Sequence, residues 1–275
     1  MSQPTLAHVL IPKWRSILTR ARQERDSGGR AKLIVLLTVG GIFWLAVFGV
    51  LFRMLRYFKG QEEIGALLAG KLLSLALVSF ISILLLSNVI TALSSFFLAK
   101  DLDLLVSSPV DWLKIYLAKL LETVANSSWM VALMSVPLFA AYGVAYGGGW
   151  SFPLVCLAAF VPFLVLPAVV GSAITTVLVN VFPARRTRDL LSIIALGAAA
   201  GVILLFRLIR PEQLARPEGF QNLLDFIAVL RAPTSPLLPS EWVTNAVLGH
   251  LVGQPDWLSL YLLWTTAAVF IAAGA

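Results

Sequence analysis

The feature that most limits the fold is a run of 62 residues, 123–184, that contains no Asp, Glu, Lys or Arg. As a single helix this run would be about three times as long as the roughly 20 residues that cross a bilayer. The run must therefore turn back once, and the Gly-Gly-Gly-Trp-Ser segment at 147–151 is the expected hairpin. The sequence predicts two consecutive membrane-spanning helices here, near 123–146 and 152–182.

The rest of the chain is similarly apolar. Hydrophobic residues make up 59% of it and charged residues 13%, whereas a soluble domain carries about a quarter charged residues. This composition excludes a water-soluble globule. We predict an all-α fold, a polytopic membrane helix bundle of about six transmembrane helices. The chain would then divide into a cytoplasmic amphipathic segment at 1–32 and a transmembrane domain at 33–275, with the other four spans near 33–52, 72–99, 190–209 and 257–275.

The distribution of basic residues predicts the orientation. With the N-terminus inside, 13 Lys and Arg lie on the cytoplasmic side and 8 on the other, as the positive-inside rule requires. We therefore expect a multi-pass protein of the cell membrane with a cytoplasmic N-terminus. The net charge of +7 is assigned to these flanks and their contacts with anionic lipids, and not to nucleic acid. No cleavable signal peptide is expected, and the apolar end at Ala275 is interpreted as a truncation.

Before the first span, four apolar residues recur at helical spacing among Lys and Arg: Trp14, Ile17, Leu18 and Ala21. This pattern predicts a basic amphipathic helix that lies on the inner leaflet. Two interpretations stay open, a plain topology signal and a docking site for a partner protein.

The loop after the second span carries a helix start signal. Ser108 can cap a helix that has Pro109 at its first position and Asp111 at its third, so a structured loop is expected to lead into the third span. A structured acidic and apolar loop suits contact with another protein, and a capped interfacial helix without a partner is the alternative. The predicted partner-coupling residues are Lys100, Asp101, Asp103, Pro109, Asp111 and Lys114.

The long outer segment before the last span contains two amphipathic stripes. One extends from Phe220 to Leu230 and the other from Trp242 to Leu251, and three prolines separate them. This pattern predicts two short helices that lie at the outer interface or dip into it.

Several chemical motifs are absent or incomplete. The segment 65–72 resembles a phosphate-binding loop, but Leu72 replaces the Ser or Thr that holds magnesium, and we interpret the match as coincidence. Cys156, His8 and His250 are too far apart to form a metal cluster. No protease or hydrolase motif occurs. The chain is therefore not expected to be an enzyme, and no catalytic, cofactor-binding or metal residue is predicted.

Polar and small residues inside the spans favour helix packing. Stripes of hydroxyl and amide side chains are expected to form hydrogen bonds between helices, with a substrate path as the alternative; they comprise Ser87, Thr91 and Ser95, and Ser172, Thr176 and Asn180. Gly197 and Gly201 form a small-residue face for a close helix contact.

The spans carry no charge in their interiors. Ion-coupled carriers need an ionisable group or a broken helix at mid-membrane. If the protein moves a solute, its energy is therefore expected from outside the membrane. A scaffold or anchor without a substrate is the alternative, and an ion-coupled carrier is a weaker one.

The order of elements resembles the permease subunit of the type-two ATP-binding-cassette exporters. The resemblance depends on the segment 96–105 (FFLAKDLDLL), on Ser108-Pro109-Val110, on Lys119 and on the outer segment 235–242 (SPLLPSEW). It implies that the loop from Lys100 to Lys114 and the N-terminal helix contact an ATP-binding subunit, whose ATP-driven dimerisation moves the spans. It also implies a second permease copy or a missing C-terminal half as partner. The substrate stays open.

Overall fold

The computed structural model describes residues 29–60, 65–93, 112–181, 196–197, 200 and 235–274. Within these ranges the regular secondary structure is helical, without strands, and five of the helices are long and apolar enough to cross a membrane. The predicted all-α membrane helix bundle is confirmed. The six helices are α2 (Gly29–Lys59), α3 (Gly65–Ala92), α5 (Trp112–Tyr146), α6 (Phe152–Val181), α10 (Pro239–Val252) and α11 (Trp257–Gly274).

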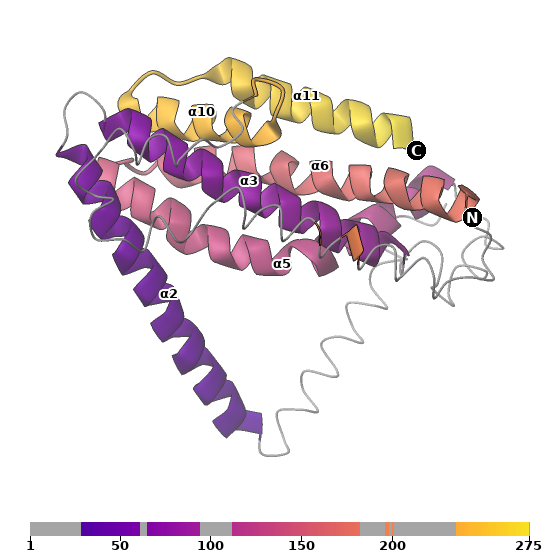
Figure 1. Cartoon of the computed structure of the whole chain (residues 1–275), viewed down its shortest axis with the longest axis horizontal. Helices are drawn as coiled ribbons and strands as arrows, with labels where there is room; N and C mark the ends of the chain where they lie inside the picture. Colours follow the sequence, from indigo (N-terminus) through magenta and orange to yellow (C-terminus); the bar gives the residue numbers. More distant parts are fainter. Residues whose placement is uncertain are drawn as a thin grey trace, which may run out of the picture.

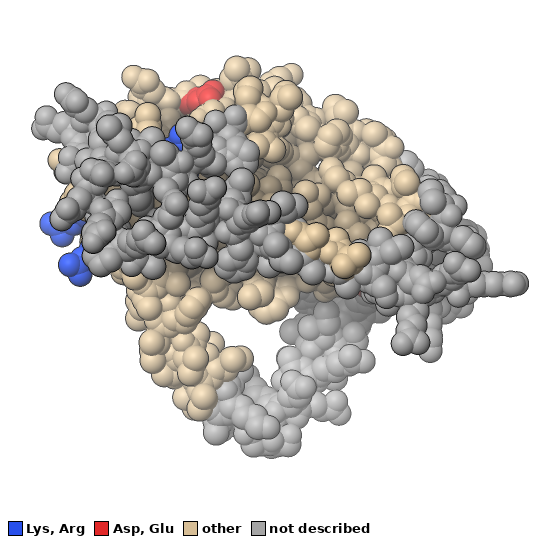
Figure 2. Space-filling view, in the orientation of Figure 1, with Lys and Arg blue, Asp and Glu red and all other residues tan. Residues whose placement is uncertain are grey.

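Four long helices, α3, α5, α6 and α11, run alongside one another, and α10 lies beside the first half of α3 (Figure 1). The bundle has two ends. The hairpin end contains the turn 147–151 together with the end of α2, the start of α3 and the start of α6. The loop end contains the start of α5, where a Cβ atom at Gly274 of α11 would meet the Tyr116 side chain. Figure 2 shows a largely uncharged described surface, with Lys and Arg gathered mostly near the hairpin end.

Glycines form the hairpin as the sequence predicts. Gly147 and Gly149 have φ angles of 75° and 66°, a region that favours glycine because a Cβ atom would clash there. The N–H groups of Gly147 and Gly148 donate to the carbonyl of Gly143 at 2.9 and 2.8 Å. Both bonds satisfy one carbonyl group at the end of α5, and α6 begins a few residues later at Phe152.

The helices extend beyond several of the charge-free stretches. α3 begins at Gly65 instead of residue 72, because Lys71 is accommodated within the helix in a partly buried position. α5 begins at Trp112, ahead of Lys114 and Lys119. The predicted fifth span, 190–209, lies outside the described residues except for 196, 197 and 200, and the N-terminal amphipathic helix also lies outside them.

The two halves of α2 have different surroundings. Its second half packs into the core, where Leu55 and Phe58 are 0% and 2% exposed. Its first half diverges from the bundle (Figure 1), and Ile34 and Leu45 are 62% and 71% exposed. In a bilayer, lipid tails would cover this apolar half without cost.

The close approach of α3 and α6 depends on one glycine. A Cβ atom at Gly171 would lie 2.9 Å from Asn88 Cβ, 3.0 Å from Asn88 C and 3.1 Å from Val89 N. Only a residue without a side chain allows the two backbones to come this near.

Candidate functional site

The structure describes one of the predicted partner-coupling residues. Lys114 is partly buried in the first turn of α5. The other predicted coupling residues, Lys100, Asp101, Asp103, Pro109 and Asp111, lie outside the described residues. The predicted helix that leads from this loop into the third span is present as α5, which continues without a break to Tyr146.

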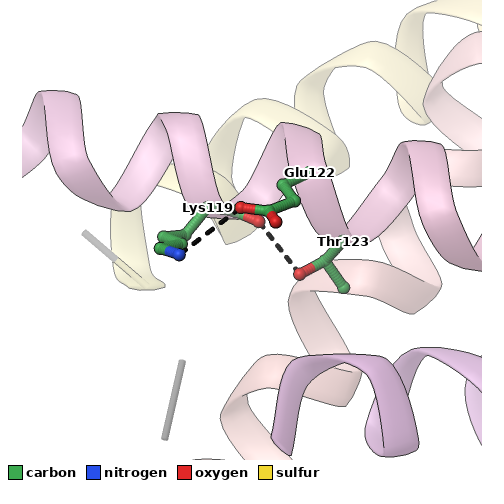
Figure 3. A network of polar contacts seen from close by, with 3 residues as sticks. All are labelled: Lys119, Glu122 and Thr123. Atoms are coloured by element: carbon green, nitrogen blue, oxygen red, sulfur yellow. Dashed lines mark hydrogen bonds and ion pairs between the residues drawn. The ribbon is translucent and has the colours of Figure 1, made fainter. Parts of the chain in front are cut away.

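The loop end of α5 contains a charged pair (Figure 3). Lys119 and Glu122 extend toward each other from one helix, with Lys119 Nζ 3.4 Å from Glu122 Oε2. The Lys119 side chain is 3% exposed and the Glu122 side chain 25%. Thr123 Oγ1 donates to the carbonyl of Lys119 at 2.9 Å. An ammonium group this deeply buried needs an anionic partner, and Glu122 supplies one on the same helix.

An apolar cluster adjoins this pair. Tyr116 and Leu120 of α5 pack against Ala168 and Val169 of α6. The charged pair thus lies within a helix segment whose contacts to α6 in this cluster are apolar, and such contacts have little directional preference.

A buried polar network joins α3, α5 and α6 near the middle of the bundle. Asn88 is 0% exposed, its Nδ2 donates to the carbonyl of Leu84 at 2.7 Å, and its Oδ1 accepts from Ser127 Oγ at 2.6 Å. Thr175 Oγ1 lies 3.1 Å from the carbonyl of Val89 on α3. These bonds satisfy polar groups that lipid tails could not.

The predicted polar stripes are only partly involved. Ser87 Oγ lies 3.4 Å from the carbonyl of Ser127, a contact between α3 and α5. The prediction is wrong for Ser172 and Thr176, whose hydroxyls donate to carbonyls of their own helix. Serine and threonine can always make this local bond, so spacing alone does not show which hydroxyl reaches a neighbouring helix. The structure describes no hydrogen bond of Thr91, and the side chains of Ser95 and Asn180 lie outside the described residues.

The predicted small-residue face at Gly197 and Gly201 stays a prediction, for a contact within the chain or across a dimer. Within the described residues, a Cβ atom at Gly197 would meet nothing within 4 Å, and Gly201 lies outside them. A close glycine contact occurs at Gly171.

The hairpin end is linked by polar contacts from several helices. Lys59 Nζ donates to the carbonyl of Ala145 at 3.0 Å, and Tyr142 Oη donates to the carbonyl of Ala69 at 2.8 Å. The last turn of α10 joins the hairpin through His250 Nε2, which is 3.0 Å from the Oγ of a serine in the turn, Ser151.

The second amphipathic stripe of the outer segment forms α10. Val243, Ala246 and Val247 of this stripe are buried against the bundle. α10 packs against α3, α6 and α11, so the helix dips between the long helices, as the sequence predicts. The first stripe lies outside the described residues.

This helix brings a carboxylate into the bundle, although the charge-free stretches of the sequence do not indicate one. Glu241, in the first turn of α10, accepts a hydrogen bond from Ser74 Oγ of α3 at 2.6 Å. Ser74 is 2% exposed and Glu241 is partly buried. The position of Glu241 early in a short helix after Pro239 is visible in the sequence, but its contact with α3 depends on how deep the helix lies.

Segment 65–72, whose sequence resembles a phosphate-binding loop, does not form a loop. The segment is the start of α3, and a Cβ atom at Gly70 would lie 3.0 Å from Leu248 Cδ1 of α10. A phosphate-binding loop needs free backbone N–H groups before the helix begins. Among the described residues, no group of three His, Cys, Asp or Glu could hold a metal ion.

Comparison with known proteins gives one match. No curated protein and no solved structure matches the chain significantly. A family model described as "Putative ATP-binding cassette" matches residues 24–274. This match covers nearly all of the chain, including every described helix, and we conclude that the chain belongs to this ATP-binding-cassette family.

Proposed function

We propose that the chain is the permease subunit of an ATP-driven exporter. In this proposal a separate nucleotide-binding subunit hydrolyses ATP, and the helix bundle moves a substrate across the membrane. The chain itself is not an enzyme and holds no ATP. Membership of an ATP-binding-cassette family and five helices able to cross a membrane support a membrane-embedded role beside an ATPase.

The observation that carries the proposal is the continuity of α5. It is 35 residues long, about 50 Å at 1.5 Å per residue, and thus longer than the roughly 30 Å hydrocarbon core. It begins within the predicted coupling segment and ends at the hairpin, with Pro137 inside it. A push on the loop would therefore reach the opposite end of the bundle through one continuous helix.

The contacts along α5 support such transmission. Near its start it meets α6 through the apolar cluster around Tyr116 and Leu120, and near its end it is bonded to α3 through Tyr142. The orientation that places the start of α5 in the cytoplasm, beside the ATPase, is part of the proposal.

The proposal is tested by co-purification and ATPase stimulation with a separately produced nucleotide-binding protein. Asp101→Lys combined with Asp103→Lys should reduce stable association by at least about tenfold. The two substitutions reverse the charge of the predicted contact surface, so basic groups of the nucleotide-binding protein would be repelled instead of attracted. The matched control is Glu62→Lys combined with Glu63→Lys, which reverses two acidic residues on the opposite predicted side.

Three outcomes count against the proposal. Association that is unchanged in the Asp101 and Asp103 variant would contradict the coupling residues. Equal loss in the Glu62 and Glu63 control would contradict the predicted sidedness. ATPase turnover that does not change when the chain is reconstituted would favour the alternative, a membrane scaffold or anchor without a transported substrate.

A further inference from the structure

The carboxylate of Glu241 lies in a setting that is unusual for a charged group. It is at the start of α10, and α10 rises about 14 Å from this residue to His250 at 1.5 Å per residue. Because His250 contacts the hairpin, Glu241 lies well below the hairpin and between the long helices. Figure 1 shows α10 running beside the first half of α3.

The membrane depth follows from the start of α11, because Trp257 and His250 line the same small pocket and so lie at one level. Trp257 at its start is 67% exposed, as expected for an aromatic residue at the membrane interface. Glu241 is therefore within the half of the hydrocarbon layer that adjoins the hairpin.

The turn before α10 holds Glu241 in place. Trp242 Nε1 donates to the carbonyl of Pro236 at 2.8 Å, and the N–H of Leu238 donates to the carbonyl of Ser235 at 2.9 Å. Pro239 opens the helix without a side-chain cap. The backbone just before Glu241 is thus fixed by hydrogen bonds within the turn.

The interactions of this carboxylate are incomplete. Ser74 is its hydrogen-bond donor, and no Lys, Arg or His forms an ion pair with it among the described residues. The neighbouring Ser240 is 0% exposed, and its Oγ has no hydrogen-bond partner within the described part of the chain. An ionised carboxylate at membrane depth costs at least about 3 kcal/mol on insertion scales unless a partner offsets it.

We infer that the Glu241 carboxylate, which Ser74 holds in position, binds the cationic group of an amphiphile. An ammonium or guanidinium group would pair with the second carboxylate oxygen, and the apolar part of the ligand would lie among the helices or lipid tails. This inference rests on the proposed function, for which it names the substrate class. The cation could belong to a transported amphiphile or to an amine-bearing lipid of the bilayer.

The test uses the full chain in nanodiscs of a neutral lipid without an amine group. The probe is dodecylammonium, measured against empty discs, with dodecyl maltoside as a neutral probe of the same chain length. Glu241→Gln should weaken binding of the cationic probe by at least about tenfold, a change of 1.4 kcal/mol. Asp256→Asn is the matched control, because Asn retains the cap that Asp256 gives to the N–H groups of Leu258 and Ser259.

Ser74→Ala separates binding from a merely structural hydrogen bond. This variant removes the bond but retains the charge, so the cationic probe should still bind within about threefold of the original affinity. If Ser74→Ala weakens binding as much as Glu241→Gln, Glu241 only fastens α10 to α3 and the inference is wrong. The same conclusion follows if the unmodified chain binds the cationic and neutral probes equally, a measurement that needs no variant.

A second arm identifies the source of the cation. Discs that contain phosphatidylethanolamine should weaken probe binding if a bilayer lipid occupies the site, and should leave it unchanged if only a transported amphiphile does. Both results support the cation site. If the cationic probe does not bind but the chain still stimulates the ATPase, the cation site is wrong and the permease proposal stands. If the probe binds but the ATPase is not stimulated, the chain has a cation site and the permease proposal is wrong.

Discussion

The hairpin end and the loop end of the bundle are held together in different ways. At the hairpin end, hydrogen bonds connect α2 with α5, α5 with α3, and α10 with the hairpin. At the loop end, within the residues that the structure describes, Lys119 pairs with Glu122 along α5 (Figure 3), and α5 meets α6 through an apolar cluster. The polar links are directional, and the apolar ones are not.

This difference assigns a mechanical role to each end. Hydrogen bonds keep a particular geometry, so the hairpin end fixes the helices relative to one another. Apolar surfaces can shift by small amounts, so the cluster around Tyr116 and Leu120 by itself permits small movements of α5 against α6. In the proposed permease, force would arrive at the loop end and the helices would pivot about the hairpin end.

The largest effect is expected at the crossing that lies between the two ends. Gly171→Leu would force α3 and α6 apart, because the first side-chain atom already meets the Asn88 backbone. We expect a loss of about 3 kcal/mol in the free energy of unfolding. The measurement is unfolding by sodium dodecyl sulfate in mixed micelles, followed by circular dichroism.

Gly49→Leu is the control for this substitution, because a Cβ atom at Gly49 would meet nothing within 4 Å. It should change stability by less than about 0.5 kcal/mol. Equal losses in both variants would show that helix flexibility, and not the crossing, determines the effect.

The next largest effect is expected for the polar network at the same crossing. Asn88→Ala removes the acceptor of the Ser127 hydroxyl inside the bundle. Loss of one buried bond between membrane helices should cost about 1 to 2 kcal/mol in the same unfolding measurement. Ser82→Ala is the matched control, since its hydroxyl donates only to Val78 of its own helix. A smaller loss for Asn88→Ala than for the control would contradict a stabilising network.

The helices and the hairpin could be predicted from the sequence, because charge-free length and a glycine cluster are local properties. α6 and α11 begin at Phe152 and Trp257, where the apolar pattern begins. The start of α3 could not be predicted in this way. Lys71 is partly buried, and it does not end the helix because its side chain can extend toward water.

The contacts of the candidate sites were less predictable. Asn88 bonds to Ser127 of another helix, whereas Ser172 and Thr176 bond within their own helix. Thr175 Oγ1 lies near carbonyls of both helices, 2.8 Å from Gly171 and 3.1 Å from Val89. The partner of a hydroxyl depends on helix rotation, which spacing along one helix does not determine. Glu241 could not be predicted for a related reason, since its depth depends on the packing of α10 against α3, α5, α6 and α11.

A moderate effect is expected at the hairpin end. Tyr142 is 0% exposed and its hydroxyl bonds to the carbonyl of Ala69. Tyr142→Phe should cost about 1 kcal/mol in unfolding free energy, because the carbonyl already has its helical bond and only one hydrogen bond is lost. Tyr57→Phe is the control, since Tyr57 is 53% exposed. If both substitutions are neutral, the hairpin end is not fixed by this bond, and the contrast between the ends becomes weaker.

The smallest effect is expected for the outermost contact of the hairpin end. Ser151→Ala removes the contact with His250, which is exposed to solvent, so water can replace the lost partner. We expect a loss of at most about 0.5 kcal/mol. Thr123→Val is the comparison at the loop end, because it removes a hydrogen bond that stays within α5. If Ser151→Ala costs more than Tyr142→Phe in the same unfolding measurement, the α10 connection, and not the α3–α5 bond, is what fixes the hairpin end. The pivot of the proposed movement would then lie on α10, next to the turn that presents Glu241.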